Sequence, residues 1–181
     1  MFKKILIGLV VLLVLLAIVV ALQPSDFRIS RSAAISAPPE KVFAQVNELR
    51  NWEAWSPWAK MDPFMKQTYE GPAAGSGAVS RWAGNNEVGE GSMTITESKA
   101  PEQVRIRLEF IKPMAGTSDV NFTFKPQGSE TLVTWNMAGK SNFAGKAFDL
   151  FMDMDKMLGS QFDQGLAQLK AVSETPDAPR N

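Results

Sequence analysis

Hydrophobic and polar residues alternate along most of the chain. The clearest example is VRIRLEF at residues 104–110, where every second residue is apolar and the residues between are charged. Successive side chains of a strand point to opposite faces, so this pattern predicts strands with one apolar and one polar face. The same reasoning, applied between glycine, proline and short polar connections, predicts seven strands at 27–37, 67–70, 78–83, 91–98, 103–111, 118–125 and 131–138.

Apolar residues recur at intervals of three or four in two other segments. The first runs from Val42 to Leu49 after Pro38-Pro39-Glu40, and it predicts one short helix with proline in its first turn. The second runs from Phe148 to Val172 and predicts a long amphipathic helix. The tail at 174–181 is rich in proline and is expected to be disordered.

The order of these elements predicts an α+β domain over residues 27–173. Consecutive strands with short connections form an antiparallel sheet, and the long helix near the C-terminus is the simplest cover for its apolar face. A strongly curved sheet around one helix need not close tightly. We therefore expect an apolar cavity between them.

Three tryptophans, Trp52, Trp55 and Trp58, lie close together between the short helix and the second strand. Pro57 and Pro63 prevent a long helix here, so the stretch is expected to be a loop with single helical turns. Each indole can remove roughly 200 Å² from water, so most of this surface must be covered. Core packing, a cavity rim, sugar stacking and the lipid interface are the alternatives. We expect at least one ring in the core and at least one at a cavity entrance.

The first segment, residues 1–23, is either a membrane anchor or a signal peptide. An unbroken apolar run from Ile5 to Leu22 would span ~27 Å as a helix, close to the ~30 Å hydrocarbon core of a bilayer. Val19-Val20-Ala21 would also suit a signal peptidase. The length of the run favours an anchor. Lys3 and Lys4 favour an inside N-terminus with the domain on the outer, periplasmic or extracytoplasmic, side.

The amino-acid composition excludes several classes of function. The formal net charge is +0, so no basic field is available to hold nucleic acid. The sequence contains no cysteine and no histidine, which excludes disulfides, thiolate nucleophiles, imidazole bases and the most common transition-metal ligands. We expect no cofactor, no metal and a monomer.

Asp155 falls between Phe151 and Leu158 on the apolar stripe of the last predicted helix. A carboxylate in that position would have a raised pKa and could act as an acid, a base or a hydrogen-bond acceptor for a ligand. The simpler interpretation is that MDMDKM marks a kink, where Asp153 or Asp155 caps a new helical turn near Lys156.

Three stretches together resemble one known superfamily. They are ISAPPEKVFAQVNELRNWEAWSPW at 35–58, GEGSMTI at 89–95 and FMDMDKMLGSQFDQGLAQLK at 151–170. Their combination is similar to the START-like or SRPBCC superfamily, which includes the polyketide cyclase/dehydrase-related family. This resemblance implies a helix-grip fold, with a curved seven-stranded antiparallel sheet around a C-terminal helix. It also implies a deep pocket for lipids, sterols, polyketides or similar molecules.

The leading hypothesis is a membrane-tethered, non-catalytic domain that binds a hydrophobic small molecule or lipid in this cavity. A cyclase, aromatase or dehydratase acting in the same pocket is the second hypothesis. An envelope interaction protein that uses the Trp52–Trp58 loop is the third. Candidate pocket residues are Trp52, Trp55, Trp58, Trp82, Met93, Phe110, Trp135, Met137, Phe151, Asp155 and Phe162.

Overall fold

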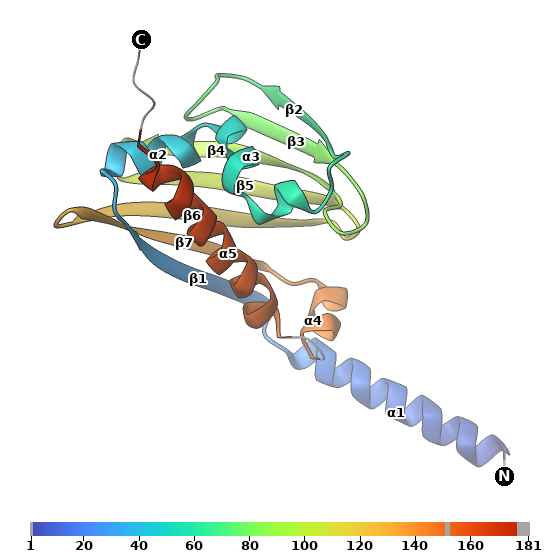
Figure 1. Ribbon diagram of the computed structural model, residues 1–181. Coiled ribbons are helices and arrows are strands. Elements are labelled where there is room, and N and C mark those ends of the chain that lie inside the picture. The colour runs from blue at the N-terminus through green and yellow to red at the C-terminus, as the bar shows by residue number, and fades with distance from the viewer. Residues whose placement is uncertain (1, 151–152, 177–181) are drawn as a thin grey trace.

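Residues 2–150 and 153–176 are described by the computed structural model, which contains the predicted seven strands (Figure 1). The elements are α1 (Phe2–Leu22), β1 (Asp26–Ile35), α2 (Pro39–Asn47), η1 (Leu49–Asn51), α3 (Trp52–Trp55), η2 (Pro57–Lys60), β2 (Lys66–Glu70), β3 (Val79–Ala83), β4 (Glu90–Lys99), β5 (Gln103–Lys112), β6 (Gly116–Gln127), β7 (Glu130–Lys140), α4 (Phe143–Asp149) and α5 (Met154–Glu174).

All strand pairs are antiparallel, in the order β1-β7-β6-β5-β4-β3-β2. Every neighbouring pair except β1 and β7 is consecutive in the chain, as short connections require. The sheet curves around α5, which crosses its concave face, while α1 projects away from one end (Figure 1). The predicted α+β helix-grip fold is therefore confirmed.

The apolar face of the sheet is built from side chains in register. Ile95, Ile106, Val120, Met137 and Ile29 are successive cross-strand partners from β4 to β1. All five are buried. This row confirms the alternation in the sequence, because a shift of one residue in any strand would turn its apolar set outward.

Helix α5 packs closely on the sheet at Trp135 of β7. The Trp135 and Phe162 rings are stacked with centroids 4.1 Å apart. A Cβ atom at Gly165 would lie only 2.8 Å from the Trp135 ring, so glycine permits this approach. Leu166 and Leu169 continue the buried stripe toward the C-terminal end of α5. The helix therefore packs tightly on the sheet over its second half.

The tryptophan stretch forms short helical turns, as predicted. The indole of Trp52 donates to the carbonyl of Val46 at 3.0 Å, and that of Trp55 donates to the carbonyl of Gln45 at 3.1 Å. Both rings pack edge-on against Trp135. These bonds satisfy the polar atom of each ring and fix the loop to α2.

The long helix predicted from Phe148 onward is interrupted, because α4 ends at Asp149 and α5 begins at Met154. The Asp153 side chain accepts a hydrogen bond from the backbone N–H of Lys156 at 3.0 Å, which confirms the predicted cap.

The end of the domain lies beyond the predicted boundary. The Glu174 carboxylate accepts a hydrogen bond from the backbone N–H of Ser36 at 2.6 Å, so the first residue of the predicted tail is part of the fold. Residues 177–181 of that tail lie outside the described residues.

We expect the substitution Trp55→Ala to lower the free energy of unfolding by about 3–5 kcal/mol, because this ring is fully buried and fills the α3 contact with the sheet. Urea unfolding of the full chain in detergent would measure the change. Phe64→Ala is the control, since Phe64 is 91% exposed and its loss should change stability by no more than ~0.5 kcal/mol. Equal effects of the two substitutions would contradict the packing described here.

Candidate functional site

A cavity of about 340 Å³ lies between the concave face of the sheet and the first half of α5. Its inner wall includes the buried residues Ile106 and Val120 of the cross-strand row. Leu158 and Phe162 line it from α5, whereas Leu166 does not. The hollow therefore begins where the tight packing at Trp135 ends.

The mouth of the cavity lies at the end of the sheet where β7 ends and β6 begins. Lining residues with exposed side chains are found at Met114 in the β5–β6 connection and Thr117 at the start of β6. Others are Lys140 at the end of β7 and Asn142 just after it. Gly145 of α4 also lines the cavity. Because β1 begins at this same end, with Asp26 opposite Lys140, the mouth lies beside the start of the domain.

The wall is mainly aromatic and aliphatic. Trp82 packs edge-on against Phe110 at 5.6 Å, and Trp58 packs edge-on against Phe162 at 6.3 Å. A volume of this size would hold on the order of ten water molecules, each of which needs several polar partners. An aromatic and aliphatic wall offers few hydrogen-bond partners to water, so the cavity is better suited to an apolar guest.

The structure places eight of the predicted site residues on this wall. They are Trp52, Trp58, Trp82, Met93, Phe110, Trp135, Met137 and Phe162. Trp55 does not line the cavity: it is completely buried in the core, beside the Trp52 ring. Phe151 lies outside the described residues.

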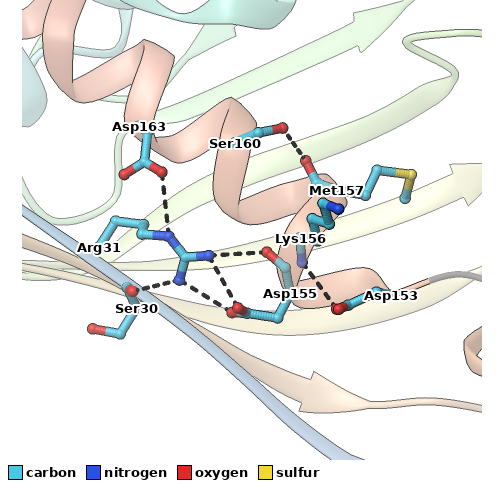
Figure 2. Close-up of polar contacts among 8 residues, drawn as sticks. All are labelled: Ser30, Arg31, Asp153, Asp155, Lys156, Met157, Ser160 and Asp163. Atoms are coloured by element: carbon cyan, nitrogen blue, oxygen red, sulfur yellow. Dashed lines mark hydrogen bonds and ion pairs between the residues drawn. The ribbon is translucent and has the colours of Figure 1, made fainter.

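Asp155 does not line the cavity either, and on α5 it faces Arg31 of β1 (Figure 2). Its carboxylate accepts hydrogen bonds from the Arg31 guanidinium at 3.0 and 3.1 Å, and its side chain is 61% exposed. The hydrogen bond from Arg31 lowers the pKa of Asp155, the opposite of the shift expected for a buried acid. The prediction that Asp155 lines the pocket is corrected, because Asp155 belongs to the row of α5, with Gly159 and Asp163, that faces β1.

Arg31 holds the first turns of α5 against β1. Besides Asp155, its guanidinium forms an ion pair with Asp163 at 3.4 Å (Figure 2). A Cβ atom at Gly159 would collide with this guanidinium, so glycine provides the space that it occupies. The cluster is an external clamp on the helix that forms one wall of the cavity.

Several lining residues were not among the candidates predicted from sequence. Leu108 shares the apolar face of β5 with Phe110, so its alternation could have identified it. Met65 and Val88 lie in connections, where no periodic pattern indicates which way a side chain points. Only the tertiary contacts bring these connections to the cavity.

Ionisable groups on the described part of the wall are limited to Glu53 and Lys140, and both residues are exposed. The Glu53 carboxylate accepts a hydrogen bond from the Tyr69 hydroxyl at 2.7 Å. Within residues 2–150 and 153–176, no group of three or more acidic residues is arranged to hold a metal ion. The polar chemistry of the cavity is therefore confined to its edge and a few hydroxyl and amide groups.

A curved sheet that encloses an apolar cavity against a C-terminal helix defines the helix-grip class of ligand-binding domains. The chain matches the family described as "Polyketide cyclase / dehydrase and lipid transport" over residues 26–174. It belongs to this family, as the resemblance predicted.

Solved structures agree with this assignment at the level of the fold. A Mesorhizobium loti protein is 15% identical, with a TM-score of 0.61, and the match covers 84% of this chain and 100% of that one. A Chromobacterium violaceum protein is 17% identical, with a TM-score of 0.59, and the match covers 85% of this chain and 100% of that one. A search of curated proteins finds no significant match.

The Arg31 clamp predicts a pH dependence. The pKa of Asp155 is lowered in the folded protein, so the ion pair stabilises the fold above roughly pH 4, and this contribution is lost as the pH falls through the folded pKa. In Arg31→Gln, the pKa of Asp155 should rise toward its ordinary value, as measured by carboxyl carbon NMR titration. Glu97, whose pKa is lowered by Lys99, is the internal control and should not change. An unchanged Asp155 titration would contradict the clamp.

Proposed function

We propose that this protein binds a hydrophobic small molecule or lipid in the cavity, beside a membrane to which α1 tethers it. The observation that carries the proposal is the cavity itself, whose inner wall is apolar and whose few charged groups lie at the edge. The family description, which includes lipid transport, supports the same class of ligand.

The volume of the cavity limits which ligands can fit inside it. A volume of about 340 Å³ is near the lower end of the ~300–1,000 Å³ range of ligand pockets. This favours a single acyl chain or a small fused-ring compound over a whole two-chain lipid. The hydroxyl groups of Ser118 and Thr117 and the Lys140 ammonium would then face a polar head group at the mouth.

The tether is α1, the one helix in the described chain that is long and apolar enough to cross a membrane. By sequence alone such a helix is either a span or a signal segment. Two contacts favour a retained anchor: Val20 is 3% exposed where α1 meets α4, and the Lys146 ammonium donates to the carbonyl of Ala21 at 3.4 Å. Lys3 and Lys4 favour an inside N-terminus, with the domain on the outer side.

The two other hypotheses have less support. A cyclase or dehydratase is consistent with the family description, but it needs an ionisable group in contact with the guest. Within the described residues only Glu53 and Lys140 could supply one, and Asp155 is no longer a candidate. A partner-binding tryptophan loop would need exposed rings, whereas Trp52 and Trp55 are buried and Trp58 is half-buried.

A cavity-filling substitution tests the proposed function. Leu108 faces the cavity from β5, so Leu108→Trp should occupy guest space and raise the dissociation constant of a fluorescent fatty acid at least about tenfold, equivalent to ~1.4 kcal/mol. Titration of the full chain in detergent would measure this.

The matched control is Arg107→Trp, which adds the same ring to the outer face of the same strand. It should leave binding unchanged. No binding of fatty acid, sterol or polyketide probes to the wild-type chain, or equal effects of the two variants, would count against the cavity as the binding site.

A further inference from the structure

Exposed large apolar side chains of the described domain are confined to one end of the sheet. Outside α1, they are Phe64, Ile111, Met114, Phe143, Phe148 and Met157. Phe64 precedes β2, Ile111 is near the end of β5, and Met114 is in the β5–β6 connection. Two are on α4, and Met157 is in the first turns of α5. We refer to these six residues as the apolar rim.

The antiparallel register brings all these segments to the same end. Phe110 of β5 is opposite Gly116 of β6, and Lys112 is opposite Glu90 of β4. This is the end at which β1 begins and α1 is attached, as Figure 1 shows. The opposite end, with the β6–β7 hairpin, has no exposed large apolar side chain among the described residues.

The apolar rim also borders the mouth of the cavity. Met114 is 49% exposed and lines the cavity, so it belongs to both. Asn142 and Gly145, on either side of Phe143, line the same opening. Single exposed apolar residues are normal on a protein surface, but a group around a ligand entrance is typical of a docking surface.

The attachment of α1 places this end close to the bilayer. Four Cα steps separate Leu22 from Asp26, which limits their distance to ~15 Å. The connection is also held to the sheet, because the backbone N–H of Ser141 donates to the carbonyl of Ser25 at 2.7 Å. There is no long linker that would let the domain move away from the membrane.

Packing of α4 on α1 gives the level of the domain relative to the bilayer. The apolar run from Ile5 to Leu22 is ~27 Å long as a helix, so it needs its whole length to cross a hydrocarbon core of ~30 Å. Val20, within that length, is buried, and the Lys146 ammonium of α4 donates a hydrogen bond to the carbonyl of the next residue, Ala21. α4, with Phe143 and Phe148 exposed, therefore lies at the edge of the hydrocarbon layer.

We propose that the apolar rim inserts into the bilayer that α1 crosses, so that the cavity opens into lipid and its guest enters laterally without passing through water. This inference rests on the proposed function for its anchor and its guest. Insertion would transfer the exposed rim side chains from water to the interface, where apolar burial is favourable. The occupant of the surface is the bilayer, because the tether holds this surface against it at all times.

The absence of cysteine in the sequence allows a direct test with single-cysteine variants of the full chain. Phe64→Cys and Phe143→Cys place an NBD label on the rim. Ser129→Cys places it in the exposed connection between β6 and β7, at the opposite end. Each protein is reconstituted into phosphatidylcholine vesicles with and without nitroxide-labelled acyl chains.

We expect a blue-shifted emission and loss of most of the fluorescence with nitroxide lipid at residues 64 and 143, and neither change at residue 129. Unquenched labels at both rim positions, with α1 inserted, would overturn the inference. If the fluorescence of the rim labels changed with the protein-to-lipid ratio and not with nitroxide lipid, the rim would contact a second copy of the chain. That result would also overturn the inference.

Fatty acid binding in detergent separates this inference from the proposed function. If the fatty acid binds and the rim labels are unquenched, membrane docking fails and the cavity function stands. If the rim labels are quenched and no apolar compound binds, the domain docks but the proposed ligand-binding function fails.

Discussion

The contact of Trp135 with Phe162 and Gly165 is the interaction on which the rest of the domain depends. It is one of the points at which α5 touches the sheet, with the Trp135 and Phe162 rings stacked and glycine allowing the helix to approach. Trp52, Trp55 and Trp58 all meet Trp135 edge-on, so the tryptophan loop is positioned by the same side chain. A long amphipathic helix held tightly over its second half leaves space beneath its first half, and this space is the cavity.

A second contact holds the other half of α5 without closing that space. Arg31 reaches the helix from β1 and binds Asp155 and Asp163 on its outer surface, with its guanidinium against Gly159. Because the clamp is polar and external, it fixes the helix without filling the interior. Two glycines on α5 thus have different roles: Gly165 permits contact with an aromatic ring in the core, and Gly159 makes room for an arginine at the edge.

The mouth, the apolar rim and α1 share one end of the sheet, and the proposed docking of the domain on a membrane rests on this arrangement. An isolated cavity would favour any apolar guest that could reach it through water. A cavity whose entrance is held against a bilayer by a three-residue connection, 23–25, would instead favour guests already dissolved in lipid. The small volume and the charged Lys140 at the edge are consistent with an amphiphile that leaves its head group at the mouth.

Local patterns in the sequence were sufficient for the strands, the short α2 helix, the turns of the tryptophan loop and the Asp153 cap. Each of these features depends only on residues close together in the chain. Alternation appears wherever one face of a strand is buried, and a helix cap needs only a hydrogen bond to the first turn of the helix. The prediction for Asp155 was wrong because spacing alone did not show that its row of α5, with Gly159 and Asp163, faces β1 instead of the cavity.

The sequence by itself determined the composition of an apolar sheet face, an amphipathic helix and a segment able to span a membrane. Only the tertiary structure decided where the helix approaches the sheet and where it leaves a hollow. It also decided that Trp55 is core while Trp58 is cavity wall. Residues as distant as Met65, Met114 and Asn142 line one cavity for the same reason. The physical reason is that periodicity records which face of an element is buried, whereas the distance between two buried faces depends on the side chains that meet across them.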